Sequence, residues 1–599
     1  MDSPSVAKRA EILALILTGA ALGLIQILIG GTRLIFSFPA YAVLATVGLL
    51  TIFSLREPKP RSNELCLLSS AIFFGYVLLR AFFSPVTYLA RPDTYSVLAG
   101  LVVYLFIASE CTSARARAYL IFFLLSIAVV HVVIGAIQFR DGTNFMLIPS
   151  LERFDYGQRA SGFYVCPNHL AGLLEVLAIF CVSLVCWSRL PTWSKLLIGY
   201  VGAVCVFGIV MTGSRGGFAS TVAGIGVFAG LSLIVLRPAG RQLFWRAGGV
   251  GALATLAVAS SFLFLIHRSD VLLHRAQVMS DSAQLRLDLW HAAIQQWKVQ
   301  PWIGTGSGTY LYYGRLFRVD RMQQDPIDAH NDYLHLLAEY GLVGGVLFVL
   351  FLSAHLRNGW KDFRRLGPKR VSDVTGLLSN RLALNMGALA SVAAYMLHSF
   401  VDFNLHIPAN VLLLAFVFGI LANAGVRPES EDSPAPSSIL GWRLLLPILG
   451  LVLAVQSYRL LPGEYFAERA RTAVRDEHTD VAIVFAERGL TSETRNPNLY
   501  QYLASAQFAR CDEISSSQDR VQCNQAPLSV LEKARALAPE DRVILVQLAL
   551  AYDAVGRYPE GEWAFYEAQK WDPKSIYLNQ IYKFHLSQWQ TVSEQSSDD

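Results

Sequence analysis

Long apolar stretches alternate with short polar segments along most of the chain. Stretches long enough to cross a hydrocarbon core of about 30 Å lie at approximately 12–30, 36–55, 65–83, 95–109, 118–138, 170–187, 195–212, 217–236, 248–266, 334–356, 382–400, 408–424 and 439–458. From about residue 463 the pattern becomes that of an ordinary soluble protein. The pattern predicts an all-α protein with a transmembrane bundle of about 12–13 spans followed by a soluble helical region.

Composition and charge support a membrane protein. Of the 599 residues 53% are hydrophobic and only 16% are charged, and the net charge of +5 comes from short basic clusters between apolar runs. That distribution indicates orientation in a membrane and not a nucleic-acid surface. With a cytoplasmic N-terminus, Lys8/Arg9, Arg115/Arg117 and the dense run from Arg357 to Arg370 fall in cytoplasmic loops. The long loops 139–169 and 267–333 and the C-terminal region are then expected outside.

The C-terminal region carries a repeat. A polar, proline-rich linker is predicted at 425–438, and Pro539 and Pro573 lie about one tetratricopeptide period apart. The positions between them at which that repeat places its packing residues are filled by Leu545, Leu548, Tyr552, Gly556, Phe565 and Ala568. Residues 542–575 therefore resemble a tetratricopeptide unit, with a degenerate unit near 480–509 and an inserted loop at 510–526. The alternative is a generic helical hairpin.

Two of the eight cysteines lie in this soluble part. Cys511 and Cys523 flank the inserted loop, and an isolated pair around a short loop is typical of a disulfide in an oxidising compartment. The alternative is two unrelated thiols in a cytoplasmic domain. The other six, in or near the spans, are expected to be small apolar fillers.

Three polar clusters are expected at the outer membrane edge, where polar groups are costly unless they pair or function. The first is a glycine turn, Thr212-Gly-Ser-Arg215-Gly-Gly217; a snorkelling arginine is the alternative. The second is Arg286-Leu-Asp-Leu-Trp290, with helical spacing of its apolar residues and Arg286 near the helix start, followed by Gly304-Thr-Gly306-Ser-Gly308. Because no strand precedes these glycines, a nucleotide site is not indicated. We expect a turn that brings backbone close to a substrate.

The third cluster runs from His330 to Gly345. Asn331 or Asp332 is expected to cap a helix that continues into a span, which places His330 at the helix entrance. His335 and Glu339 are one turn apart and raise a metal hypothesis with His330. However, His330 lies off that helical face and the His-Glu-x-x-His spacing is absent, so no metal is predicted. An ordinary polar surface histidine is the alternative for His330.

Together the clusters resemble a known family. The motifs that carry the resemblance are Ser214-Arg215-Gly216-Gly217, Arg286 with Trp290 and the glycine run, and His330-Asn331-Asp332-Tyr333-Leu334 followed by Glu339-Tyr-Gly-Leu-Val-Gly344. Gly135–Gln138 and Arg159–Gly172 are similar to further family segments. The chain resembles the O-antigen ligase and polymerase family of bacterial membrane glycosyltransferases, which includes pilin O-oligosaccharyltransferases, over about 130–425.

The resemblance implies a reaction and a set of roles. A glycan would pass from an undecaprenyl-diphosphate carrier to a hydroxyl acceptor, with inversion and without metal or cofactor, at the periplasmic face of the bacterial inner membrane. Arg215 and Arg286 are expected to bind the diphosphate and His330 to act as general base or to orient the acceptor. Supporting roles are open for Asn331, Asp332, Glu339, Asn168 and Arg159, and Asp332 or Glu339 either orients the imidazole or only caps and solvates the helix.

The resemblance leaves the acceptor open, and the change of composition near residue 463 divides the chain into two domains. Lipid A-core, a growing polysaccharide and a protein all remain open as acceptors, and membrane lipids and a protein partner of the repeat region are expected contacts. We predict a glycosyltransferase domain at 1–462, with 267–333 as its large periplasmic loop, and a periplasmic tetratricopeptide-like domain at 463–599. A glycan transporter and a non-catalytic assembly scaffold are the competing hypotheses, although no internal repeat of the transporter kind is evident.

Overall fold

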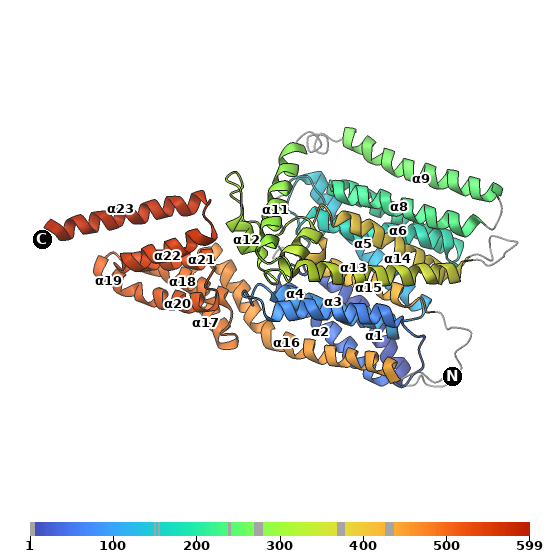
Figure 1. Ribbon diagram of the computed structural model, residues 1–599, viewed down its shortest axis with the longest axis horizontal. Coiled ribbons are helices and arrows are strands. Elements are labelled where there is room, and N and C mark those ends of the chain that lie inside the picture. The colour runs from blue at the N-terminus through green and yellow to red at the C-terminus, as the bar shows by residue number, and fades with distance from the viewer. Residues whose placement is uncertain are drawn as a thin grey trace.

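The computed structural model describes residues 6–148, 151, 153, 156–237, 241–268, 279–367, 378–425 and 437–598. These residues form helices and no strands, which confirms the all-α prediction. A bundle of long helices makes up most of the molecule, and a C-terminal helical region lies at one end of it (Figure 1). Lys369, Arg370 and most of the predicted linker 425–438 fall outside the described residues.

Helices of the bundle occur wherever a span is predicted. They are α1 Val6–Ile27, α2 Leu34–Leu50, α3 Glu64–Phe82, α4 Arg91–Leu105, α5 Ala114–Asp141, α6 Pro167–Trp187, α7 Thr192–Thr212, α8 Arg215–Leu236, α9 Arg241–Arg268, α13 Asp332–Leu366, α14 Asn380–His398, α15 Pro408–Ala422 and α16 Ser437–Arg475. Among the described helices ten are long and apolar enough to cross a membrane; α9, α14 and the shorter, apolar α15 are not among them. The prediction of 12–13 spans thus exceeds the ten that length and composition support.

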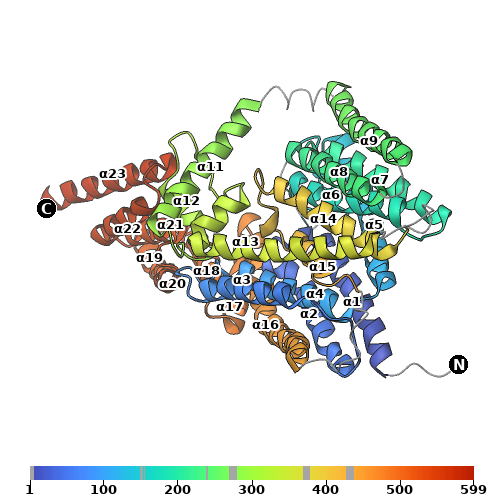
Figure 2. The ribbon, with the colours of Figure 1, turned by 45° about the vertical axis from the view of Figure 1, so that its right-hand side comes forward.

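Successive helices run in alternate directions and create two distinct ends. At one end the backbone N–H of Asn63 bonds to the carbonyl of Ala422, and Ser379 bonds to Trp187. At the other end Asp332 bonds to Ser399, and Ala160 bonds to Met211. We call the first the basic end, because it carries the predicted cytoplasmic clusters Arg115/Arg117 and Arg357–Arg365, and the second the site end. The C-terminal helices adjoin the site end (Figure 2).

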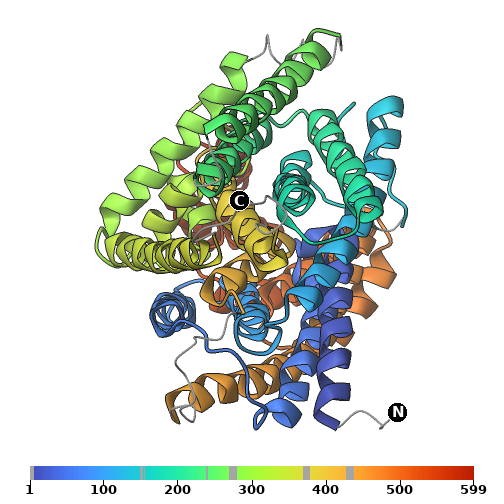
Figure 3. The same cartoon turned by 90° about the vertical axis from the view of Figure 1, so that its right-hand side faces the viewer.

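The centre of the bundle is formed by α6, α14 and α15, whose residues are buried on nearly all sides. Viewed end-on, the blue N-terminal helices and the green α8 and α9 lie on opposite sides, with yellow helices between them (Figure 3). Because α14 is surrounded by protein, it accommodates polar residues such as Asn385 and His398, both buried. These residues lower its hydropathy below that of a lipid-facing span.

The described part of the segment 267–333 includes two helices and is not simply an extended loop. It contains α11, Met279–Val299, and α12, Tyr310–Leu316. Since α11 begins seven residues before Arg286, that arginine lies in the second turn of the helix and not near its start. The first residues of α11, 279–284, are mostly polar in sequence, so apolar periodicity could not reveal them.

The C-terminal region is a stack of helix pairs. Its helices are α17 Thr479–Ser492, α18 Pro497–Asp512, α19 Ser517–Cys523, α20 Gln525–Leu537, α21 Arg542–Ala554, α22 Tyr558–Trp571 and α23 Ile576–Asp598. Leu545, Leu548, Phe565 and Ala568 are buried in one cluster, as a tetratricopeptide unit requires. Cys511 and Cys523 form the predicted disulfide, with 5.7 Å between their Cα atoms. Residues 517–523 of the predicted inserted loop are helical.

The predicted domain boundary at residue 462 falls inside a continuous helix. α16 extends through Pro447 and Pro462 from the bundle into the C-terminal region. Glu468, near its end, bonds to Arg33 in front of α2 at 2.5 Å, and Arg91 at the start of α4 pairs with Glu493. The C-terminal region is therefore tied to the site end by ion pairs as well as by α16.

Candidate active site

The turn between α7 and α8 holds Arg215 at the start of a helix. Gly213 ends α7 in the left-handed conformation, with φ 61°, and the side chain of Ser214 accepts a hydrogen bond from the N–H of Gly217 at 3.2 Å. Arg215 is the first residue of α8, at the positive end of the helix dipole. Helix N-termini and arginine forks both favour phosphate oxygens. This turn is therefore suited to an anion.

Arg215 and Arg286 line the same small pocket. This pocket is also lined by Asn168 and Asp402 and by residues of the α7–α8 turn. Arg286 comes from α11 and Arg215 from α8, so two residues far apart in sequence converge at the site end as predicted. Two cations on one pocket repel each other, and the carboxylate of Asp402 offsets the charge of only one of them. The arrangement therefore favours an anion.

His330 lies beside this pocket in a constrained conformation. Its φ is 49°, which is uncommon for a residue with a side chain. Its carbonyl accepts a hydrogen bond from the indole of Trp290 at 3.2 Å, and its ring packs edge-on against Phe403 at 4.6 Å. Asn331, the next residue, caps α13 by accepting from the N–H groups of Tyr333 and Leu334, each at 3.0 Å. The cap thus belongs to Asn331, and Asp332 is the first helical residue.

Asp402 contacts His330 and was not anticipated from the sequence. Its Oδ1 lies 3.5 Å from Nδ1 of His330 and its Oδ2 lies 3.8 Å from Nε2 of His398. Burial raises the pKa of Asp402, but the contact with His330 and the charges of His398 and His169 outweigh burial and lower the pKa to well below the usual range. The carboxylate therefore stays ionised next to the imidazole.

The chain of contacts continues into the bundle. Nδ1 of His398 lies 3.0 Å from Oε2 of Glu175, and the hydroxyl of Ser220 bonds to the same carboxylate. All three side chains are fully buried. A signal existed in the sequence, since His398 lies near the end of one apolar stretch and Asp402 follows four residues later, before the next stretch. The hydropathy pattern predicts only spans there and does not single out these polar residues.

Asp332 and Glu339 are engaged elsewhere and do not contact the imidazole of His330. Asp332 lies 3.2 Å from Nδ1 of His406 and accepts from the N–H of Leu405. Glu339 accepts from the backbone N–H groups of Gly308 at 3.0 Å and Tyr310 at 2.9 Å, and lies 3.4 Å from His335. Of the two expectations for these acids, the one in which they support the helix and its surroundings fits their contacts.

The glycine run packs against protein backbone and not against an open pocket. Gly304, with φ 71°, lies so close to Glu339 that an added Cβ would stand 2.3 Å from its carbonyl oxygen. Gly341 interrupts α13 with φ 66° and faces Trp302 in the same way. The expectation of a turn close to substrate is therefore wrong. The glycines instead allow residues 301–308 to dock on α13, which fixes the segment after α11.

Asn168 and Arg159 lie behind the two arginines. Asn168 lines the pocket, and its Oδ1 accepts from Nη2 of Arg159 at 2.9 Å. Arg159 is buried and also donates to the carbonyl of Thr212 at 2.8 Å. Arg159 thus supports the α7–α8 turn and orients Asn168.

A histidine cluster near the site fits a metal ion poorly. Asp328, His335 and His406 each offer a ligand atom within 4.8 Å of the others, which differs from the set considered from the sequence. The rings of His335 and His406 are stacked, 4.1 Å apart and inclined by only 24°. An ion bound by both histidines would lie about 2 Å from each nitrogen and near the plane of each ring. Because the two ring planes are nearly parallel, they do not intersect at that distance from the nitrogens. Burial lowers the pKa of His406, but the bond to Asp332 and the charges of Asp93, Asp332 and Asp328 raise it to about 10.

A large apolar cavity lies on the other side of the 399–406 turn. It is lined mainly by apolar side chains of α3, α4, α13 and α15. Its polar lining includes Asp93, Asp332 and His406. The turn therefore separates a cationic pocket from an apolar cavity within the membrane-spanning bundle.

Comparison with known proteins agrees with the motif analysis. Residues 200–349, which include Arg215, Arg286 and His330, match the family model described as O-antigen ligase. No curated protein matches the chain. One similar solved structure is a thermophilic TPR protein of Thermus thermophilus, at 19% identity and a TM-score of 0.19, over 25% of this chain and 84% of that one. The resemblance to O-antigen ligases is confirmed for residues 200–349, and the match supports a membrane glycosyltransferase role.

Proposed function

We propose that the protein transfers a glycan from an undecaprenyl-diphosphate carrier to a hydroxyl acceptor at the periplasmic face of a bacterial inner membrane. The observation that carries this proposal is the convergence of Arg215 and Arg286 on one pocket beside the His330–Asp402 pair. The acceptor is a lipid A-core, a growing polysaccharide or a protein, and the reaction inverts the sugar without metal or cofactor.

The arginines act on the leaving group. As the glycosidic bond breaks, negative charge grows on the carrier diphosphate. Guanidinium groups fixed around that diphosphate stabilise the transition state more than the ground state. The N-terminus of α8 adds backbone donors to the charge of Arg215.

His330 takes the proton of the acceptor hydroxyl as general base. Asp402 fixes the orientation of the ring and stabilises the imidazolium that forms, as a buried carboxylate does for a catalytic histidine. The constrained backbone at His330 and its bond from Trp290 hold the ring at the pocket. Asn168 contributes an amide to the same pocket.

The lipid part of a substrate needs an apolar path within the bundle. The apolar cavity beside the 399–406 turn supplies such a path, and its polar lining at Asp332 and His406 lies close to the proposed chemistry. An isoprenoid chain of the donor and a lipid chain of the acceptor are both compatible with its lining.

Topology supports a periplasmic site. The basic clusters gather at the end of the bundle opposite to His330, as the positive-inside rule expects of a cytoplasmic face. The disulfide in the C-terminal region suits an oxidising compartment. We therefore assign the site end and residues 463–599, a tetratricopeptide-like domain with a protein partner, to the periplasm, and residues 1–462 to the glycosyltransferase domain.

A reconstituted transfer assay tests the proposal. The purified full chain in lipid nanodiscs would be incubated with a defined undecaprenyl-diphosphate glycan and, in parallel, with lipid A-core, lipid-linked glycan or pilin. Transfer to one acceptor is expected, with loss in Arg215→Ala and Arg286→Ala. Transfer that is unchanged in both variants would overturn the assignment of the pocket.

A further inference from the structure

We infer that the C-terminal region positions Arg286 in the pocket through the short segment Arg318–Arg321 and Asp288. This inference rests on the proposed function. It makes the C-terminal region part of the apparatus that aligns the donor, in addition to any role in binding a partner.

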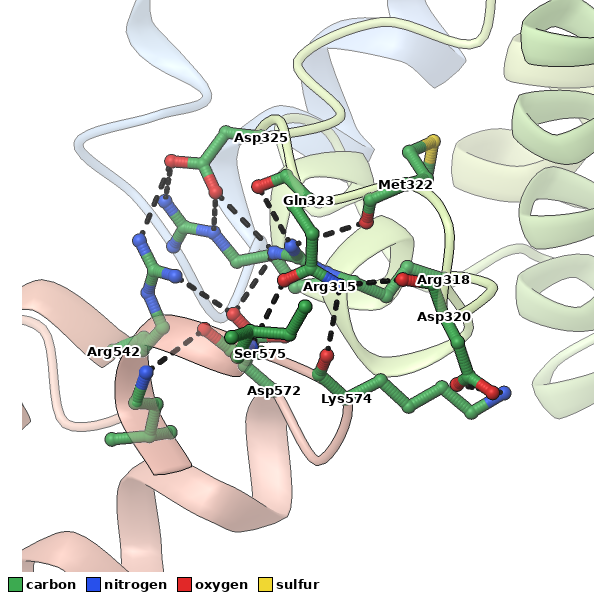
Figure 4. Close-up of polar contacts among 12 residues, drawn as sticks. Arg315, Arg318, Asp320, Met322, Gln323, Asp325, Arg542, Asp572, Lys574 and Ser575 are labelled. Atoms are coloured by element: carbon green, nitrogen blue, oxygen red, sulfur yellow. Dashed lines mark hydrogen bonds and ion pairs between the residues drawn. The ribbon is translucent and has the colours of Figure 1, made fainter. Parts of the chain in front are cut away.

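The first link joins the C-terminal region to the segment after α12. Nη2 of Arg318 lies 2.9 Å from Oδ2 of Asp572, and both side chains have no exposed surface. Nη1 of Arg542 donates to the same oxygen at 2.8 Å. Asp325 binds Arg315 through both carboxylate oxygens, at 3.0 and 2.8 Å. Figure 4 shows these side chains of the two regions interleaved around Asp572 and Asp325.

Hydrogen bonds from a side chain to the backbone fix how the two regions align at the same junction. Gln323 donates to the carbonyl of Lys574 at 3.1 Å and accepts from the N–H of Ile576 at 2.9 Å (Figure 4). Tyr312 and Tyr313 of α12 pack against Trp571, with ring centroids 6.0 and 5.8 Å apart. A contact that combines buried charge, side-chain-to-backbone hydrogen bonds and aromatic packing defines one arrangement of the two regions.

The second link runs through a tight turn. The guanidinium of Arg318 also donates to the carbonyl of Gln323 at 3.1 Å, and the N–H of Met322 bonds to the carbonyl of Val319 at 3.0 Å. These bonds fix Arg321 relative to Arg318. Displacement of Asp572 therefore displaces Arg321.

The third link reaches α11 beside the pocket. Arg321 forms a two-pronged pair with Asp288, through Nε at 2.8 Å and through Nη2. The hydrogen bond from Arg321 holds the pKa of Asp288 below its usual range. Asp288 stands two residues after Arg286, so the two side chains point to nearly opposite sides of the helix. The ion pair between Arg321 and Asp288 thus restrains the rotation of α11 about its axis. It thereby sets the direction in which Arg286 points on the opposite side of the helix.

The rest of α11 is anchored nearer its C-terminus. Gln296 bonds to the hydroxyls of Thr305 and Thr309 at 2.8 and 3.0 Å, and Tyr310 bonds to the carbonyl of Leu289 at 2.9 Å. Near Arg286, the ion pair between Asp288 and Arg321 adds a restraint on the side of α11. Loss of that restraint is expected to loosen Arg286 while the remainder of the helix stays in place.

Hydrogen exchange and kinetics test the inference in the full chain. Asp572→Asn weakens the first link from the C-terminal region, and Asp288→Asn weakens the third link in α11, so the two changes lie in different parts of the molecule. Both are expected to speed amide exchange over 283–292 by about 1.5-fold to fivefold, the range for loss of an exposed ion pair. Exchange in α8 should not change. Asp480→Asn, in a highly exposed ion pair of the C-terminal region with Arg510, is the matched control and should leave α11 unchanged.

A double-mutant cycle separates positioning from general damage. Asp288→Asn should raise the KM for the donor about threefold to tenfold with a smaller effect on kcat, and should have no further effect when Arg286 is already alanine. In an Arg215→Ala background its effect should persist. Unchanged exchange over 283–292 in both variants would overturn the inference, and so would an undiminished effect in the Arg286→Ala background. If no donor supports transfer, the proposed function fails, whereas the exchange result still decides whether the C-terminal region restrains α11.

Discussion

The carboxylate of Asp402 lies 3.5 Å from the imidazole of His330, although the two residues belong to different interhelical segments. His330 precedes α13, and Asp402 follows α14. The N–H of Asp332 bonds to the carbonyl of Ser399 at 2.9 Å, which brings the two segments together. The acid–base pair of the proposed reaction is therefore created by packing of the segments and not by local sequence.

Replacement of Asp402 tests whether this contact serves the chemistry. Asp402→Asn keeps the shape but removes the charge that stabilises an imidazolium. We expect kcat to fall about 10²- to 10⁴-fold, the range of general acid–base contributions, while the KM for the donor changes little. Asp141→Asn, an exposed carboxylate at the same end of the bundle, is the control. Equal activity of Asp402→Asn and the unmodified protein would exclude Asp402 from the reaction.

Replacement of the arginines tests how the diphosphate is held. Arg215→Ala and Arg286→Ala should each weaken donor binding and lower kcat/KM by about 10²- to 10³-fold, the cost of removing one oxyanion donor. Lysine at either position should restore only part of the rate, because a point charge lacks the two-pronged geometry. Donor titration together with kinetics of the four variants measures both effects. A fully active Arg215→Lys would favour an arginine that merely anchors α8 at the membrane edge.

Much of the fold was predictable because membrane spans and tetratricopeptide helices have strong periodic signals. Every predicted span coincides with a helix, and Leu545, Leu548, Phe565 and Ala568 occupy the expected core. The polar start of α11 was missed because polar residues carry no apolar pattern. Likewise α14 is surrounded by other helices and contains buried polar residues. Its hydropathy therefore does not show whether it lies inside the membrane-spanning bundle.

The site was predictable in part for a similar reason. Arg215 and Arg286 stand in motifs with recognisable neighbours, and both line the pocket. Asp402 and the network through His398 and Glu175 depend on contacts between distant segments, which periodicity does not encode. The glycine run misled for a physical reason, since a close approach of backbone looks the same in sequence whether the neighbour is a substrate or another helix.

The ion pair between His406 and Asp332 should give the protein a pH-dependent stability. The pKa of His406 in the folded protein is raised to about 10, above its ordinary value of about 6.5. The stabilisation is therefore fully present below about pH 6.5 and is lost as the pH rises through about 10. His406→Gln should reduce the free energy of unfolding by about 1.5–3 kcal/mol at pH 6, and the difference should shrink toward zero near pH 10. Thermal unfolding from pH 6 to 10 measures it, and a constant difference would rule out a charged His406.

Cysteine labelling tests which face carries the site. In spheroplasts a membrane-impermeant maleimide should label Cys511 and Cys523 only after reduction, because both are joined in the disulfide. Labelling should then occur without lysis, since the C-terminal region is expected in the periplasm. Arg365→Cys, at the basic end, serves as the opposite marker and should react only after the cells are broken. If the reduced thiols of Cys511 and Cys523 react with the maleimide only after lysis, the C-terminal region and the adjoining pocket of Arg215 and Arg286 lie in the cytoplasm. The periplasmic donor would then have no access to those arginines.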